Sequence, residues 1–228
     1  MTERYADRRS AGIALAKRLA RYRGREAVVL GLPRGGLPVA AELAEALDLP
    51  LDIVLVRKIG VPGNPELALA AVAGPEGRTL ALNRELATAF GLDARGIEDL
   101  AVPQRAELAR RRQLWLGASA GAGLAGKIAI LVDDGMATGA TMRAAIAAVR
   151  EQAPAQVVVA VPVAASDAVA ALRGIVDQVV CLSRPEPFIA VGAHYARFPQ
   201  VSDLEVRDIL DAAASRVPRV RPAERDRN

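Results

Sequence analysis

The amino-acid sequence predicts an α/β fold, a parallel sheet with helices on both of its faces. Short apolar segments alternate along the chain with amphipathic segments, which is the pattern of strands joined by crossover helices. The apolar segments are continuous, as expected of strands that are buried on both faces. Hydrophobic residues make up 52% of the 228 residues and charged residues 25%, a composition that is typical of a folded protein.

The first half of the chain supplies two of the expected strands. A charged segment, residues 7–22, is expected to form a leading helix. The apolar run 27–31 follows it as the first core strand. Apolar residues at helical spacing then predict a helix over residues 39–47, and a second strand is expected over residues 52–57.

The second half of the chain repeats this alternation. The apolar stripe of Met142, Ile146 and Val149 predicts one helix, and the last helix begins at a capping box formed by Ser202 and Glu205. The remaining expected elements are strands over residues 127–133, 156–161 and 176–182 and a helix over residues 166–172.

Residues 65–123 interrupt the alternation. Residues 67–73 and 78–82 are predicted to pair as a hairpin across a Gly-Pro-Glu-Gly turn. Residues 97–116 are expected to form a charged helix that is broken or bent at Pro103. We expect this insertion to form a small subdomain, the hood, that packs over one end of the sheet.

The sequence therefore predicts a core of residues 1–64 and 124–215 and an inserted hood of residues 65–123, which ends in a glycine-rich linker. Residues 216–228 form a basic tail that we expect to be disordered. The tail holds five arginines against two acids, a net +3 of the chain's formal +4. A basic tail without interleaved aromatic residues is a poor nucleic-acid footprint, so no nucleic-acid partner is expected.

The cysteine content and the lengths of the apolar runs indicate the cellular compartment in which the protein is expected. The single cysteine, Cys181, lies in an apolar run, and one cysteine cannot form a disulfide within the chain. The longest apolar runs fall well short of the ~20 residues that a spanning helix needs. No apolar stretch leads the chain as it does in a signal peptide. We therefore expect a cytoplasmic protein with no membrane partner.

The most informative motif is the segment Asp133-Asp134-Gly135-Met136-Ala137-Thr138-Gly139-Ala140-Thr141, which follows a buried strand and leads directly into a helix. Ligands bind at the carboxyl ends of strands in α/β proteins. Two glycines allow backbone N–H groups to approach an anion, two threonines add hydroxyl donors, and the helix N-terminus adds a partial positive charge. These features predict a cradle for one phosphate group.

Two adjacent carboxylates, Asp133 and Asp134, precede the cradle. Such neighbours repel each other and resist desolvation, so they fit a site where they accept hydrogen bonds from a sugar diol or face a cation. A phosphate cradle beside a diol acceptor indicates a ribose 5-phosphate site. The alternative is an ordinary Asp-Asp-Gly turn followed by a helix cap.

This array resembles the phosphoribosyl pyrophosphate (PRPP) motif of type I phosphoribosyltransferases, in which two acids precede a Thr-Gly-x-Thr loop. Residues 7–210 as a whole resemble a bacterial subgroup of predicted phosphoribosyltransferases whose acceptor is unknown. The resemblance implies a type I phosphoribosyltransferase-like fold and transfer of ribose 5-phosphate from PRPP to a nitrogen acceptor, with release of pyrophosphate. It further implies Mg²⁺ held through water by Asp133 and Asp134, a homodimer, and a role in nucleotide and nucleoside metabolism.

Two further segments fit the family in the same order along the chain. Arg34, Gly35 and Gly36 follow the first strand, where the resemblance places a pyrophosphate-binding loop with a non-proline cis peptide near Arg34-Gly35. Apart from the resemblance, an arginine beside glycine amides can bind an anion such as a phosphate group. Arg57 and Lys58 follow the second strand, where the adenine and orotate branches carry a basic pair that meets pyrophosphate. Solvated surface charges are the alternative for these side chains.

The acceptor site is less clearly marked. Phe188 and Val191 lie in a segment that resembles the base-binding loop of purine phosphoribosyltransferases, and Phe188 either stacks on a base or anchors the last helix. Glu66 is the candidate for a general acid or base. Ala137 stands where the 6-oxopurine branch has an aspartate, which disfavours hypoxanthine, guanine and xanthine as acceptors.

Two hypotheses of different classes remain. The first is an enzyme, a glycosyltransferase of the pentosyltransferase kind. The second is a PRPP-binding sensor without transfer activity, since the fold alone does not decide function. The presence of Arg34 and Lys58 favours the enzyme because a sensor does not need to stabilise departing pyrophosphate. An α/β hydrolase is disfavoured because the one Gly-x-Ser-x-Gly segment, residues 117–121, lies in the glycine-rich linker after a predicted helix and not on a turn from a strand to a helix.

Overall fold

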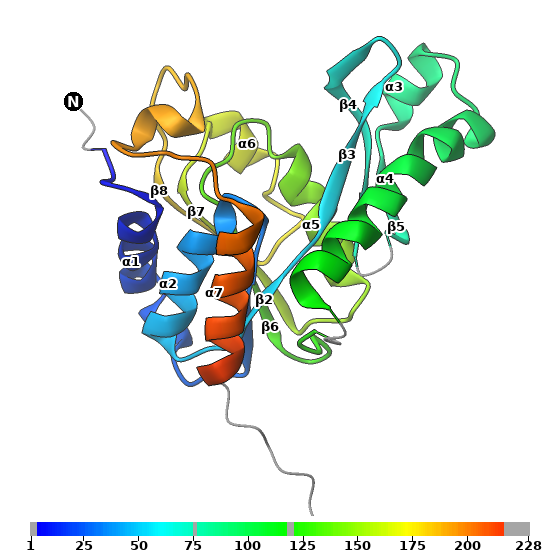
Figure 1. Ribbon diagram of the computed structural model, residues 1–228. Helices are drawn as coiled ribbons and strands as arrows, with labels where there is room; N and C mark the ends of the chain where they lie inside the picture. The colour runs from blue at the N-terminus through cyan, green and yellow to red at the C-terminus, as the bar shows by residue number, and fades with distance from the viewer. Residues whose placement is uncertain (1–3, 75–76, 118–120, 217–228) are drawn as a thin grey trace, which may run out of the picture.

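A five-stranded parallel sheet lies at the centre of the molecule, as the computed structural model shows for the described residues 4–74, 77–117 and 121–216 (Figure 1). Its strand order is β2-β1-β6-β7-β8, and every neighbouring pair is parallel. This confirms the predicted α/β fold. The strands are β1 (Ala27–Gly31), β2 (Leu51–Ile53), β6 (Ile128–Val132), β7 (Gln156–Val163) and β8 (Gln178–Ser183).

Helices cover both faces of the sheet. α1 (Arg8–Arg18), followed by the short helix η1 (Ala20–Tyr22), and α2 (Gly36–Leu47) pack on one face. α5 (Ala140–Arg150) and α6 (Ser166–Ala170) pack on the other. None of the helices in the described part of the chain combines the length and apolar character needed to cross a membrane.

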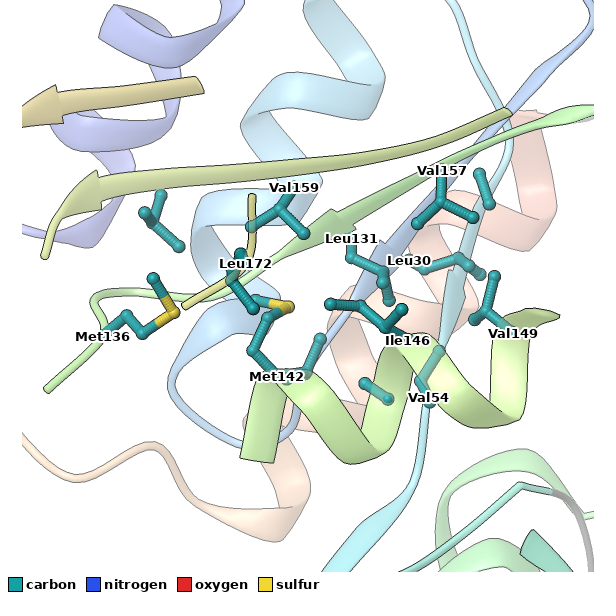
Figure 2. Packing of buried hydrophobic residues seen from close by; sticks show 14 of the residues in the cluster. Leu30, Val54, Leu131, Met136, Met142, Ile146, Val149, Val157, Val159 and Leu172 are labelled. Carbon is teal, nitrogen blue, oxygen red and sulfur yellow. The ribbon is translucent and has the colours of Figure 1, made fainter. Parts of the chain in front are cut away.

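The contact between α5 and the sheet shows why the apolar pattern gives this fold (Figure 2). Met142, Ile146 and Val149 recur at helical spacing, and all three side chains are buried. In Figure 2 they point from α5 into the same cluster, with Ile146 beside Leu131 of β6, Val149 beside Leu30 of β1 and Met142 beside Leu172. Burying a large apolar side chain contributes about 1.5–3 kcal/mol, so this stripe fixes α5, and with it the loop that precedes α5, against the sheet.

A separate antiparallel sheet, the hood sheet, consists of β3 (Val56–Val61), β4 (Asn64–Ala73) and β5 (Thr79–Leu82), and α3 (Arg84–Ala89) and α4 (Ala94–Leu116) follow it. The predicted hairpin is therefore present. β3 precedes residue 65, where the predicted hood begins. The single strand predicted over residues 52–57 is wrong, because the chain leaves the core sheet after β2 and pairs with β4 from Val56 onward. Val54 and Leu55, which join the two sheets, are buried, so the apolar run gives no sign of the change.

Of the two outcomes predicted at Pro103, a break is wrong, because Pro103 lies inside the continuous helix α4, and a bend stays a prediction. Proline removes one backbone donor, and both Pro103 and Asp99 are exposed, so water can satisfy the carbonyl left without a partner. The division into a core and a hood of residues 65–123 stays a prediction. Parts of the predicted linker (118–120) and tail (217–228) lie outside the described residues.

The C-terminal part of the chain returns to the same end of the sheet as the loops after β1 and β6. The short helix η2 (Val191–His194) precedes an extended segment, and α7 (Asp203–Arg216) then packs beside α2 (Figure 1). Tyr5 near the N-terminus pairs with Tyr195 through an isolated parallel bridge. The N-terminal segment is thus held beside the segment that precedes α7.

Candidate functional site

The strand order creates a switch point between β1 and β6. The chain runs from β1 outward to β2 and later returns to β6 on the other side of β1, so the loops after β1 and β6 diverge from adjacent strand ends. Such a point is where open α/β sheets bind ligands. Gly31 pairs with Val132 in the sheet, and the Leu32 amide donates to the Val132 carbonyl at 2.9 Å. The first loop, the glycine loop (residues 32–36), therefore begins beside the acidic pair, Asp133 and Asp134.

The glycine loop lies so close to the acidic pair that there is no room for a side chain at Gly35 or Gly36. A Cβ atom on Gly35 would lie 2.1 Å from Asp134 Oδ2, and one on Gly36 would lie 2.7 Å from the Asp133 Cα atom. The peptide bond between Pro33 and Arg34 is cis, one residue before the bond named from the sequence. The structure thus brings together two predicted segments that are about a hundred residues apart.

The acidic pair occupies a desolvated position. Burial, and then the negative charge of Asp134, raise the pKa of Asp133 well above its usual range. Burial also raises the pKa of Asp134, while the hydrogen bond from Arg8 acts in the opposite direction. Two half-buried carboxyls with raised pKa values favour ligands that bring hydrogen-bond donors or positive charge.

Arg8 is the main site residue that the sequence did not indicate. Its Nε atom donates to Asp134 Oδ2 at 2.8 Å, and the two side chains are only 10% and 13% exposed. Arg8 also donates from NH1 to the Pro199 carbonyl at 2.6 Å, and its guanidinium carbon lies 3.7 Å from the centre of the Phe198 ring. The partners are 126 residues apart in the chain, so no local pattern could have revealed them.

Tyr195 supports the same residue from a second direction, since its hydroxyl donates to the Asp134 carbonyl. Its ring packs against those of Tyr5 and Phe198, at centroid distances of 5.7 and 4.9 Å. Burial, followed by the charge of Asp134, raises the pKa of Tyr195, so the hydroxyl remains a donor at physiological pH.

The phosphate loop, residues 135–141, connects the acidic pair to α5. Gly139 has φ +74° and precedes Ala140, the first residue of α5, so a residue with a side chain would be strained there. Ala137, Thr138 and Thr141 are exposed, whereas Met136 is buried in the core and anchors the loop. The loop therefore leaves its two threonines exposed directly before and within the first turn of α5, and its role as a phosphate cradle stays a prediction.

The predicted basic pair points in two directions. Arg57 donates to Gln104 of α4 at 3.1 and 3.3 Å. Lys58, the next residue of β3, faces the other side of the hood sheet, where it lines a cavity of about 390 Å³ together with Thr141 and Arg143 of α5. The structure thus places Lys58, and not Arg57, beside the phosphate loop.

The other predicted residues are distributed around this centre. Arg34 lies 3.7 Å from Asp203 at the start of α7 and is 40% exposed. Val191 touches the phosphate loop, because a Cβ atom on Gly135 would come within 2.4 Å of it. Phe188 stacks on His194 at a centroid distance of 5.7 Å. Glu66 lies in β4, and its side chain is outside the described part of the structure.

The donor set fits a magnesium ion only as part of a complex with a ligand. The described residues contain no group of three or more His, Cys, Asp or Glu side chains placed to hold a metal. Mg²⁺ is usually bound through one or two carboxylates together with water and substrate phosphates. The acidic pair could supply such a contact beside the phosphate loop.

Comparisons with known proteins agree with this geometry. The family model for the phosphoribosyl transferase domain matches residues 2–196. Curated proteins of two Mycobacterium tuberculosis strains, which carry a provisional phosphoribosyl transferase name, are 46% identical over 209 residues, which is 92% of this chain and 47% of each relative. The chain thus spans about half the length of these relatives. A crystal structure of the protein TT1426 from Thermus thermophilus is 46% identical, covers 91% of this chain and 97% of its own, and has a TM-score of 0.77.

Proposed function

Because the chain belongs to the phosphoribosyl transferase family, we propose that it transfers the 5-phosphoribosyl group of PRPP to a nitrogen acceptor and releases pyrophosphate. The observation that supports this most strongly is the meeting of the glycine loop, the acidic pair and the phosphate loop at one switch point. A ribose that carries a 5-phosphate and a 1-pyrophosphate offers a suitable group to each of the three. The enzyme would be a pentosyltransferase, with a nucleobase as its acceptor.

The phosphate loop would bind the 5-phosphate through its amides, Thr138 and Thr141, aided by the helix dipole of α5. Asp133 and Asp134 would accept hydrogen bonds from the ribose hydroxyls, which offsets the cost of their burial. These contacts fix the sugar, so that C1′ is held in one place while its substituents exchange. Positioning of this kind is a major source of catalysis when the protein forms no covalent intermediate.

The leaving group would lie against the glycine loop. Arg34, the Gly35 and Gly36 amides, and Lys58 would stabilise the negative charge that pyrophosphate gains as the C1′–O bond breaks and the C1′–N bond forms. Mg²⁺ would supply further charge neutralisation when it is bound with the substrate. Arg57 instead would fix α4 through Gln104. The proton of the acceptor nitrogen would pass to solvent, since Ala137 cannot accept it.

The acceptor would bind next to Val191, which touches the phosphate loop. The absence of an acid at Ala137 favours acceptors other than 6-oxopurines. We further propose that the protein acts as a homodimer in the cytoplasm and serves nucleotide metabolism, with no nucleic-acid partner.

The test is a calorimetric titration of the purified protein with PRPP, with and without Mg²⁺, followed by a screen of nucleobases for pyrophosphate release. Saturable, Mg²⁺-dependent binding and release with one acceptor are expected. If PRPP binds but no acceptor in the screen leads to pyrophosphate release, a PRPP sensor would be favoured instead. If PRPP does not bind to the folded protein, both the enzyme and the sensor hypotheses would be overturned.

Two adjacent cations of β3 provide a matched pair of variants. Lys58→Ala is expected to weaken PRPP binding by about tenfold, the usual effect of losing one contact between a charged group and a ligand. Arg57→Ala should change affinity much less, because its guanidinium contacts α4. Equal losses in the two variants would contradict the assignment of pyrophosphate to Lys58.

A further inference from the structure

We propose that Arg8 is a positioning residue, which holds the Asp134 carboxylate in the orientation that binds the ribose hydroxyls. This inference rests on the function proposed above. Arg8 does not contact the ligand in this role, since its side chain is only 10% exposed. It acts through Asp134, and Phe198 and Pro199 hold Arg8 in turn.

The guanidinium of Arg8 is fixed by contacts on three sides. Nε donates to Asp134 Oδ2, NH1 donates to the Pro199 carbonyl, and one face lies over the Phe198 ring at 3.7 Å. Because these contacts use two edges and one face of a planar group, the guanidinium cannot rotate without losing at least one of them. Its Nε–H therefore has one direction relative to the core.

The backbone of Arg8 is fixed as well. Asp7 caps α1, where its carboxylate accepts from the Ser10 amide at 2.9 Å while the Ser10 hydroxyl accepts from the Asp7 amide at 3.0 Å. Such a reciprocal cap defines the residue at which the helix begins. Arg8 is the first residue of α1, so its side chain leaves the helix at a defined point beside the switch point.

The Asp134 carboxylate is confined between Arg8 and the glycine loop. Oδ2 accepts from the Arg8 Nε atom, and the same oxygen lies so close to Gly35 that a Cβ atom there would come within 2.1 Å of it. Among the described residues, the one side chain that donates to this carboxylate is Arg8, which reaches Oδ2. We therefore assign Oδ1 to a ligand hydroxyl, whereas Oδ2 serves to hold the group.

A neighbouring arginine shows what an ordinary surface position looks like in the same turn of the helix. Arg9 is 75% exposed, and its Nε atom lies 3.8 Å from Glu42. Burying an arginine is unfavourable unless its partners satisfy it, and an apolar side chain could fill the same space without that cost. The buried charge of Arg8 is therefore better explained by what it does to Asp134 than by packing.

The test compares two probes that differ in the group bound by Asp134. Ribose 5-phosphate would use both the phosphate loop and the acidic pair, whereas inorganic phosphate would use the phosphate loop alone. In Arg8→Gln we expect the dissociation constant for ribose 5-phosphate to rise by about tenfold or more, since a hydrogen bond to a charged group is lost from the network. The dissociation constant for inorganic phosphate should stay unchanged, which a general loss of structure would not allow.

Three further variants complete the experiment. Arg9→Gln is the matched control and should bind both probes as the wild type does. Arg8→Lys keeps the charge but lacks the planar fork, so it should restore part of the ribose 5-phosphate affinity. Phe198→Leu leaves Arg8 in place but removes the ring beneath it, and it should weaken ribose 5-phosphate binding alone, even if Arg8→Gln does not fold.

Three outcomes would overturn the proposal. Wild-type affinity for ribose 5-phosphate in folded Arg8→Gln, or in Phe198→Leu if Arg8→Gln does not fold, would show that Asp134 needs no positioning. Equal losses for both probes would assign Arg8 a general structural role. Failure of the wild-type protein itself to bind ribose 5-phosphate or PRPP would instead remove the proposed function, and the inference with it.

Discussion

Gly35→Ala is the most direct test of the contact between the glycine loop and the acidic pair. The backbone at Gly35 has φ −63° and ψ −37°, a conformation that alanine adopts without strain. The added methyl group would nevertheless lie 2.1 Å from Asp134 Oδ2. The substitution therefore perturbs one carboxylate and leaves the local backbone free to keep its shape.

The size of the effect follows from this distance. Real Cβ atoms stay at least 3.0 Å from other heavy atoms, so Oδ2 would have to withdraw by about 0.9 Å. A shift of this size breaks the 2.8 Å hydrogen bond from Arg8. A hydrogen bond to a charged group contributes about 1.5–3 kcal/mol, which corresponds to about a tenfold to hundredfold change in affinity for a ligand that needs this carboxylate. A domain that is stable by about 5–15 kcal/mol should remain folded.

The assay is a PRPP titration combined with urea unfolding of the same preparations. Gly123→Ala serves as the control, because Gly123 is exposed and no heavy atom lies within 4 Å of an added Cβ atom. We expect Gly123→Ala to match the wild type and Gly35→Ala to lose affinity while it stays folded. Wild-type PRPP affinity in folded Gly35→Ala would refute the role of the Asp134 carboxylate in the site.

Two other substitutions test the surroundings of the site and the hood. Gly36→Ala would place a Cβ atom 2.7 Å from both the Asp133 Cα atom and the Val132 carbonyl oxygen. Because these backbone atoms cannot move away as a side chain can, urea unfolding should show that the free energy of unfolding falls by about 1–3 kcal/mol. Glu107 accepts hydrogen bonds from Arg110 and Arg111, which lower its pKa from 4.5 to about 2. Because its pKa is lower in the folded state, ionised Glu107 stabilises the protein above pH 4.5, and this stabilisation is lost as the pH falls toward 2. The free energy of unfolding of the wild type should exceed that of Glu107→Gln by under about 1 kcal/mol at pH 7, and unfolding measurements should show this difference shrink between pH 5 and pH 3.

The parts of the fold that depend on local apolar pattern could be predicted from the sequence. β1 spans the residues expected of it, and β6 lies within the run predicted for it, because a short, continuous apolar segment rich in β-branched residues favours a strand buried on both faces. The run over residues 52–57 shows the limit of this reasoning. Its side chains are apolar in either sheet, and only the hydrogen-bonding partners, which are distant in the chain, determine where one strand ends and the next begins.

The candidate site divides in the same way. The acidic pair, the phosphate loop and the glycine loop are each local motifs, and their meeting follows from the rule that ligands bind at a switch point. The sequence could not separate Lys58 from Arg57, because the direction of each side chain depends on which face of β3 meets α5. It could not indicate Arg8, whose partners Asp134 and Pro199 come from two distant segments.

The two kinds of contact at Asp134 imply different consequences for substitutions. The core sheet fixes the backbone of Asp134, since β6 lies in the interior of the sheet and is buried along its whole length. Its side chain accepts from Arg8 and its carbonyl accepts from Tyr195, and both of these residues pack against the Phe198 ring. Substitutions in the sheet should therefore lower stability before they alter binding. Substitutions in the segments around Tyr5 and Tyr195, which pair with each other, should alter binding while most of the core packing remains intact.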